Sequence, residues 1–366
     1  MATSSFYTPI ITAATNEYLP AGVYNSQVRG NLNHLRSKVS VAATLGEDTS
    51  PIDASNGGTW TTLAMVGADD WDSVDLHEGD SRVLLDRPGV WLITAGCRFD
   101  TSTQGRFQMR LRLNNSKTLC RQDSQSLSVN GQMTLSTIHR STVSTDYVEL
   151  QVSNFLADEV PVLDSNGRTR VRAVFLGVDE SNGSSWTAPT TQSTGTFASA
   201  TWNQQVRDNL RHLHERPACR AYAVSAPGAL GTGSSWVAVD LDGEDYDTDT
   251  MHSTSTNPSR VTLTRPGIWF VSAVSEAQQG AATVVNSTGL RIGVNGTGFR
   301  NAKIVDASGS GSTGFYNYFM NVSAIVFTST TTDYVELEMR QDSSVSLVVG
   351  YGSSQTTHLC ATWLGG

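Results

Sequence analysis

Basic residues are scarce in this sequence. Lysine and arginine together number 25 against 34 aspartates and glutamates, which gives a formal net charge of −9 at pH 7. Binding to nucleic acid or to anionic membranes without sequence preference needs a basic face that contacts phosphates. We therefore expect no nucleic-acid partner.

Long apolar runs are also missing. No stretch approaches the roughly 20 consecutive apolar residues that span a bilayer, and the N-terminus, MATSSFYTPI, lacks the basic and apolar regions of a secretory signal. We therefore expect that the protein is made in a cytoplasm and does not insert into a membrane.

Cysteines are few and scattered: Cys97, Cys120, Cys219 and Cys360 show no CxxC spacing and do not recur at matching places in the chain. A metal site or a disulfide framework is not expected. The sequence also lacks GxSxG, HExxH, a P-loop and a dinucleotide fingerprint. These absences predict a non-enzymatic protein without a cofactor, although carboxylates brought together by loops stay open.

An internal repeat is the most informative feature that is present. The segment NSQVRGNLNHL begins at Asn25, and NQQVRDNLRHL begins at Asn203, 178 residues later, with eight of the eleven positions identical. A period this long is close to the size of one ordinary domain. The chain is therefore interpreted as a duplicated module.

Each copy of this segment has apolar residues at helical spacing, i, i+4, i+8 and i+11. They are Tyr24, Val28, Leu32 and Leu35 in the first copy, and Trp202, Val206, Leu210 and Leu213 in the second. The stripe is narrow, like a coiled-coil seam. A short helix needs a neighbour, either its own domain or the same helix of another subunit. Arg29 and Arg207 lie beside the stripe and would form interchain pairs or face solvent.

The remainder of each copy consists of short alternating apolar runs, rich in Thr and Val and separated by Gly, Ser, Asn and Asp. This pattern predicts an all-β sandwich or barrel. We expect an arm and helix in residues 1–40, a first β domain in 41–178, a linker and second helix in 179–216, and a second β domain in 217–366.

Further matches between the copies follow in the same order. Arg87-Pro88-Gly89 and Arg265-Pro266-Gly267 predict turns before a buried strand, and TDYVEL occurs at 145–150 and at 332–337. In the strand after the first turn, Trp91, Ile93, Ala95, Cys97 and Phe99 alternate with polar or small residues, so Cys97 is expected to be buried. Glu149 and Glu336 are expected on the outer faces of their strands, as solvated edge or interface residues before catalytic ones.

The second copy resembles the C1q/TNF-like jelly roll in the order of its motifs: RPGIW, then RIGVNG, TDYVEL and the C-terminal HLCATWLGG. Combined with the upstream NxxVRDNLxxL helix, this order resembles a class of tailed-phage virion proteins labelled minor tail or tail-fibre proteins. The first copy departs from the pattern, with RLNNS in place of the VNG hairpin. The resemblance implies two jelly rolls, each preceded by a short helix. It also implies a homotrimer around an apolar axis, a location in the virion, and contacts with other virion proteins and with a host surface glycan or protein.

Three smaller features are candidate sites. The acidic residues Asp240, Asp242, Glu244, Asp245 and Asp247, followed by Asp249, would offer Ca²⁺ several oxygen ligands, but without EF-hand spacing a solvated loop is favoured. Tyr316, Tyr318 and Tyr351 are candidate surface-binding aromatics. His77 and His252 follow the acidic segments at equivalent places, which favours a structural hydrogen bond over a ligand.

Alternatives to the tail component stay open. A capsid decoration or head-fibre protein would differ only in location on the particle, and an envelope-glycan depolymerase would release reducing sugar ends. A cellular C1q-like lectin normally follows a secretory route, which the N-terminus does not favour.

Overall fold

The computed structural model describes residues 40–45, 51–52, 59–65, 67–68, 77–78, 81–99, 105–127, 132–155, 160–163, 169–177, 216–227, 230, 235–278, 285–306, 317–343, 347–352 and 356–365. The two predicted helices, in 20–38 and 202–213, lie outside these residues and stay predictions. Within the described part of the chain, no helix is long and apolar enough to cross a membrane.

The first copy forms two antiparallel sheets. The first sheet has the order β2 (Pro51–Ile52), β12 (Val160–Leu163), β7 (Gly89–Phe99), β13 (Arg170–Gly177), β1 (Ser40–Thr44) and β4 (Gly67–Ala68), with β10 (Gln132–Ser141) also paired to β7. The second has the order β5 (His77–Glu78), β6 (Arg82–Leu85), β11 (Asp146–Asn154), β8 (Gly105–Leu113) and β9 (Lys117–Leu127), with β3 (Thr61–Thr62) paired to β11.

The second copy repeats this arrangement. One sheet has the order β16 (Gly243–Asp247), β14 (Ala218–Tyr222), β24 (His358–Gly365), β18 (Gly267–Gln278) and β21 (Asn317–Thr328), with β23 (Val348–Val349) paired to β18. The other has the order β15 (Val237–Ala238), β22 (Tyr334–Ser343), β19 (Val285–Val294) and β20 (Gly298–Asp306), with β17 (Arg260–Thr262) paired to β22.

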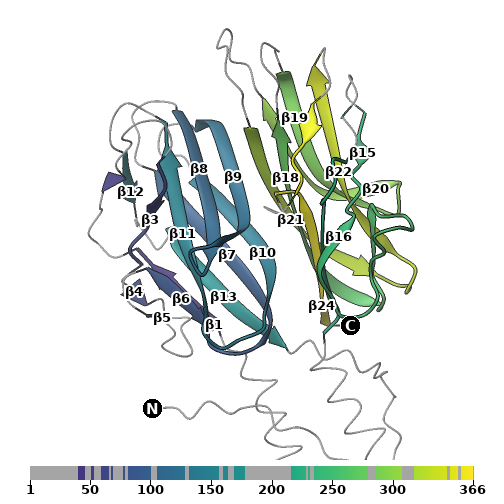
Figure 1. Ribbon diagram of the computed structural model, residues 1–366, viewed down its shortest axis with the longest axis horizontal. Coiled ribbons are helices and arrows are strands. Elements are labelled where there is room, and N and C mark those ends of the chain that lie inside the picture. The colour runs from purple at the N-terminus through teal and green to yellow at the C-terminus, as the bar shows by residue number, and fades with distance from the viewer. Residues whose placement is uncertain are drawn as a thin grey trace, which may run out of the picture.

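The order of strands confirms the duplication that the sequence predicts. The path β10-β7-β13-β1 of the first copy corresponds to β21-β18-β24-β14 of the second, and β11-β8-β9 corresponds to β22-β19-β20. Each pair of sheets closes over its own apolar core as a jelly-roll sandwich. The protein is therefore all-β, with two tandem jelly rolls that lie side by side in Figure 1, the first in purple to teal and the second in green to yellow.

The turns before β7 and β18 show the same local chemistry twice. Gly89 and Gly267 have φ values of 137° and 128°, which favour glycine. The indole N–H of Trp91 donates to the carbonyl of Arg87 at 3.1 Å, and that of Trp269 donates to Arg265 at 2.9 Å. Each tryptophan is fully buried. The turn thus places a large core side chain and satisfies its only polar atom.

Cys97 and the other inward residues of β7 are buried as predicted. Glu149 and Glu336 point away from the cores, but the expectation that they are solvated is wrong, because their exposed fractions are only 5% and 6%. Arg82 lies 3.6 Å from Glu149, and Arg260 lies 3.3 Å from Glu336. A long arginine side chain on the neighbouring strand covers each carboxylate. Strand alternation alone does not predict this covering, because it depends on a residue of another strand.

Candidate binding site at the junction of the two sandwiches

The two sandwiches meet edge against face. Strands β9 and β10 of the first sandwich approach the β16-β14-β24-β18-β21 sheet of the second (Figure 1). Along β18, Val271 and Ala273 point into the core of the second sandwich, so Phe270 and Ser272 point outward to the junction. Ordinary strand alternation therefore supplies one surface for the core and another for the first sandwich.

An apolar cluster fills the centre of the junction. From the first sandwich it contains Val90, Ile138 and Leu176, and from the second Ala218, Tyr246, Phe270 and Cys360. Ile138 and Cys360 are fully buried. Burial also raises the pKa of Cys360, which therefore behaves as a small apolar side chain.

Asn321 and Ser272 bind the backbone of the edge strand β10. The side-chain oxygen of Asn321 accepts the Ser136 N–H at 3.2 Å, and its amide group donates to the Ser136 carbonyl at 3.0 Å. The Ser272 hydroxyl donates to the same carbonyl at 2.7 Å. A side-chain amide thus takes the place of a further strand on an edge that would otherwise carry unpaired backbone groups.

A buried arginine adds a second polar contact. Arg220 of β14 is 0% exposed and donates to the Leu119 carbonyl of β9 at 3.1 Å. Asp245 lies 3.7 Å from Arg220 and accepts a hydrogen bond from Lys117 of the first sandwich at 2.7 Å. Burial raises the pKa of Asp245, but Lys117 and Arg220 outweigh it and hold that pKa below its usual value. The carboxylate therefore stays charged and links both sandwiches.

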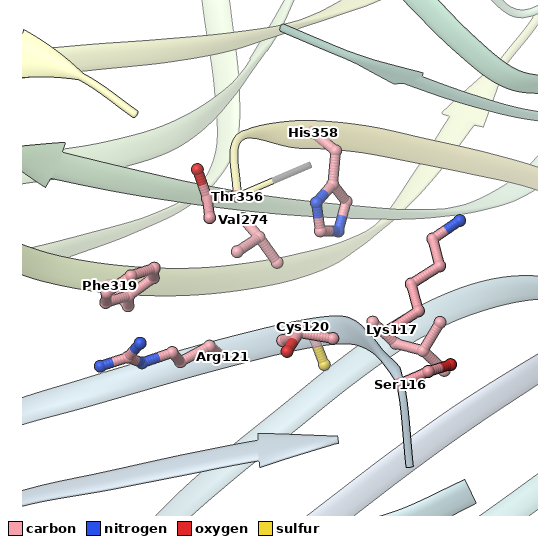
Figure 2. Close-up of a pocket in the computed structure, with 10 residues that line it drawn as sticks. Ser116, Lys117, Cys120, Arg121, Val274, Phe319, Thr356 and His358 are labelled. Carbon is pink, nitrogen blue, oxygen red and sulfur yellow. The ribbon is translucent and has the colours of Figure 1, made fainter. Parts of the chain in front are cut away.

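A cavity of about 430 Å³ opens on one side of the junction (Figure 2), and its cations already have partners. Arg121 stacks over the ring of Phe319 at 3.7 Å and lies 3.7 Å from the carboxylate of Asp123, while Lys117 is paired with Asp245. Figure 2 shows the Cys120 sulfur turned away from His358. Burial raises the pKa of Cys120 to about 12, so this thiol is not a nucleophile at neutral pH. The cavity has the character of a packing defect between charged contacts.

A second cavity, of about 580 Å³, is mostly polar and lies where β20 and β21 face β7, β9 and β10. The side chains of Gln122, Thr134 and Arg170 line it from the first sandwich, and those of Asn301 and Lys303 from the second. Burial lowers the pKa of Lys303 to about 8, an effect that Asp123 partly opposes. We call this cavity the polar cleft.

The acidic run does not converge on one point in the structure. Asp240 is exposed, and Asp245 belongs to the junction. Asp242 accepts a hydrogen bond from the Val224 N–H at 2.6 Å, and Glu244 pairs with His252 at 2.9 Å. Asp247 accepts hydrogen bonds from the N–H groups of Met251 and His252. Among the described residues, no group of three or more histidines, cysteines or carboxylates is placed to hold a metal ion. His252 also contacts the Pro258 carbonyl at 3.0 Å, so its ring holds the loop together.

The other candidate residues are described only in part. Tyr351 is 46% exposed, Tyr318 lies in β21, and Tyr316 lies outside the described residues. The helix positions Tyr24, Val28, Leu32, Leu35, Trp202, Val206, Leu210 and Leu213, with Arg29 and Arg207, also lie outside them.

Sequence reasoning missed Asn321, Arg220 and Lys303. Arg220 left a signal, because a charged residue inside the apolar strand ACRAY must either be exposed or have a buried partner. Asn321 follows the core residue Met320 on the opposite face of β21, a position that alternation alone would assign to solvent. Nothing in the sequence indicates that the other sandwich covers that face.

Comparisons with known proteins add little beyond the fold. No protein-family model matches the chain, and no curated protein matches it. Among solved structures, the chain is similar to murine APRIL at pH 5.0, with 11% identity and a TM-score of 0.29 over 41% of this chain and 100% of that one. Murine APRIL at pH 8.5 matches with 12% identity and a TM-score of 0.28 over the same shares. These scores carry no functional argument, and the jelly-roll assignment depends on the strand order given above.

Proposed function

We propose that the chain is a non-enzymatic structural protein of a virion, a homotrimeric minor tail or tail-fibre component whose jelly rolls serve as knobs for host adsorption. The virion assignment depends on the resemblance of the helix and hairpin motifs to tailed-phage proteins. The observation that carries the assembly is an uncovered apolar strip on the second sandwich.

The strip consists of Ile268, Ile325 and Phe327, which are 43%, 57% and 69% exposed. Ile268 is paired with Phe327 across β18 and β21, and Phe270 with Ile325. Phe270 belongs to the apolar cluster of the junction, so the strip continues outward from an existing interface. An exposed strip next to a buried interface is typical of an interaction surface.

The first sandwich shows what covers such a strip. In the equivalent register of β7 and β10, Leu92 is paired with Ile138, and Val90 with Arg140. Val90 and Ile138 are fully buried because the second sandwich of the same chain packs against them. The matching positions of the second sandwich have no cover within the described chain. A second copy of the protein is the occupant that we infer, because it carries a surface of the kind that covers Val90 and Ile138.

The junction joins two different surfaces, the edge of one sandwich and the sheet face of the other. Such a heterologous contact can be continued by further copies and closes into a ring when the rotation allows it. Full burial of an isoleucine or phenylalanine stabilises by about 1.5–3 kcal/mol. Covering the three partly exposed side chains therefore gives a substantial part of the free energy of association.

The variant Phe327→Asp tests the assembly. We expect it to reduce the mass measured by light scattering at micromolar concentration, because a charge would enter the apolar contact. Val348→Asp, a valine of β23 that is 43% exposed and lies outside the strip, is the matched control and should leave the mass unchanged. A folded Phe327→Asp variant with the mass of the wild type would contradict the proposal for the strip.

Leu32→Asp combined with Leu210→Asp tests the predicted helices in the same assay and should also weaken assembly. Immunogold labelling of intact particles tests the location. Label on the tail supports the proposal, whereas label on the head favours a decoration or head-fibre protein. Release of reducing ends from host envelope polysaccharide would instead indicate a depolymerase.

A further inference from the structure

The polar cleft has hydrogen-bonding side chains without a partner on the wall that the first sandwich forms. Gln122 is only 7% exposed, and its side-chain amide has no hydrogen-bond partner among the described residues, although it lines the cavity. Thr134, also from the first sandwich, lines the same cavity and likewise has no side-chain partner in the described chain. Amide and hydroxyl groups in this state are suited to the hydroxyl groups of a ligand.

Lys303 supplies a positive charge to the same space. Within the described residues no carboxylate lies within ion-pair distance of its ammonium group, whereas Lys117 in the other cavity has Asp245 at 2.7 Å. With a pKa of about 8, Lys303 is still mostly protonated at pH 7. Asp123 acts on Lys303 only from beyond ion-pair distance and is itself paired with Arg106 and Arg121. A half-buried cation without a direct ion pair favours an anionic ligand, because a carboxylate would replace the hydration that burial removes.

The shape of the cleft limits the size of the ligand. A volume of about 580 Å³ lies within the usual range for small-molecule sites and suits a short oligosaccharide. The lining is mostly polar, and its apolar side chains are those of Ala95, Leu135, Ala302 and Val322. An extended apolar ligand or a large aromatic group would find few contacts there.

We propose that the polar cleft binds a short acidic saccharide, with its carboxylate against Lys303 and its hydroxyl groups against Gln122, Thr134 and Asn301. Both sandwiches contribute to the site, so the cleft exists only while the junction stays closed, and the Asn321 contact to Ser136 is one of the contacts that close it. The inference deepens the proposed role in host adsorption. That the saccharide comes from the host surface rests on the proposed function. The binding itself can be tested on the purified full chain.

Isothermal titration calorimetry with a tetrasaccharide that contains glucuronate is the test. Its matched control ligand is the same tetrasaccharide with each carboxyl reduced to a primary alcohol. We expect the acidic form to bind and the reduced form to bind at least tenfold more weakly. Equal affinity for the two forms would overturn the assignment of an anionic ligand, and so would no detectable heat up to millimolar concentration.

Two variants locate the site. Lys303→Met keeps the length of the side chain and removes its charge, so affinity should fall at least tenfold. Arg300→Met removes an exposed positive charge from the same strand outside the cleft and should leave affinity unchanged. Unchanged binding by Lys303→Met would overturn the proposed position.

Inorganic phosphate is the remaining probe. We expect it to compete weakly, because phosphate cannot use the amide and hydroxyl wall. Equal competition by phosphate would show a general anion site and overturn the saccharide assignment. None of these outcomes affects the mass of the assembly or the position of the protein on the particle, so failure of this inference and failure of the proposed function are distinguishable.

Discussion

Replacing Asn321 by alanine should uncouple the two sandwiches while leaving each core intact. The side chain is 8% exposed and makes two hydrogen bonds to the Ser136 backbone, at 3.2 and 3.0 Å. In the variant, the Ser136 N–H loses its partner, whereas its carbonyl keeps the Ser272 hydroxyl at 2.7 Å. The loss is therefore one unsatisfied donor and one weakened acceptor.

The expected cost follows from these two losses. A buried donor left without a partner costs about 1–3 kcal/mol, and an ordinary hydrogen bond contributes about 0.5–1.5 kcal/mol. Together they predict a decrease of about 1.5–4.5 kcal/mol in the free energy of unfolding. Water that enters from the adjacent polar cleft can satisfy the N–H and would move the result toward the lower end.

Urea unfolding followed by tryptophan fluorescence measures this change, and calorimetry shows whether the transitions of the two sandwiches separate. Asn301→Ala is the matched control, because Asn301 is exposed on the neighbouring strand β20 and bonds only within the second sandwich. A decrease below about 0.5 kcal/mol for Asn321→Ala, the range of ordinary surface substitutions, would refute the role of this contact.

Two further predictions concern the first sandwich. Gly89→Ala should lower the free energy of unfolding of this sandwich by about 1–3 kcal/mol from backbone strain alone. The loss should be larger than that, because the new Cβ would lie 2.5 Å from the Gly177 carbonyl oxygen. Chemical denaturation measures this loss, and a neutral effect would contradict it. Burial lowers the pKa of His139 below 6.5 despite Asp146, so the folded state holds a neutral imidazole and stability should fall as pH drops through about 6.5. In His139→Gln, the unfolding free energy should change less between pH 7 and pH 5, and a slope as steep as that of the wild type would exclude His139 as the cause.

Much of the fold could be predicted because it depends on local patterns that occur twice. The Arg-Pro-Gly turn, the alternation after it and the TDYVEL strand each indicate β structure, and β7 and β11 are strands at those places. The repeat then implies that the second copy folds like the first, as the equivalent sheet orders confirm.

The junction could not be predicted, because it depends on contacts between residues far apart in the chain. Asn321 contacts Ser136 across 185 positions, and Arg220 contacts Leu119 across 101. Alternation shows that a side chain points away from its own core, but not whether solvent or another sandwich lies there. The burial of Glu149 beneath Arg82 was missed for the same reason.

The mass of the wild-type protein in solution tests the central claim most directly, namely that the uncovered strip of the second sandwich joins copies of this chain. Light scattering at micromolar concentration should give close to three times the chain mass of 39.3 kDa. A stable particle of 39.3 kDa under the same conditions would contradict the account.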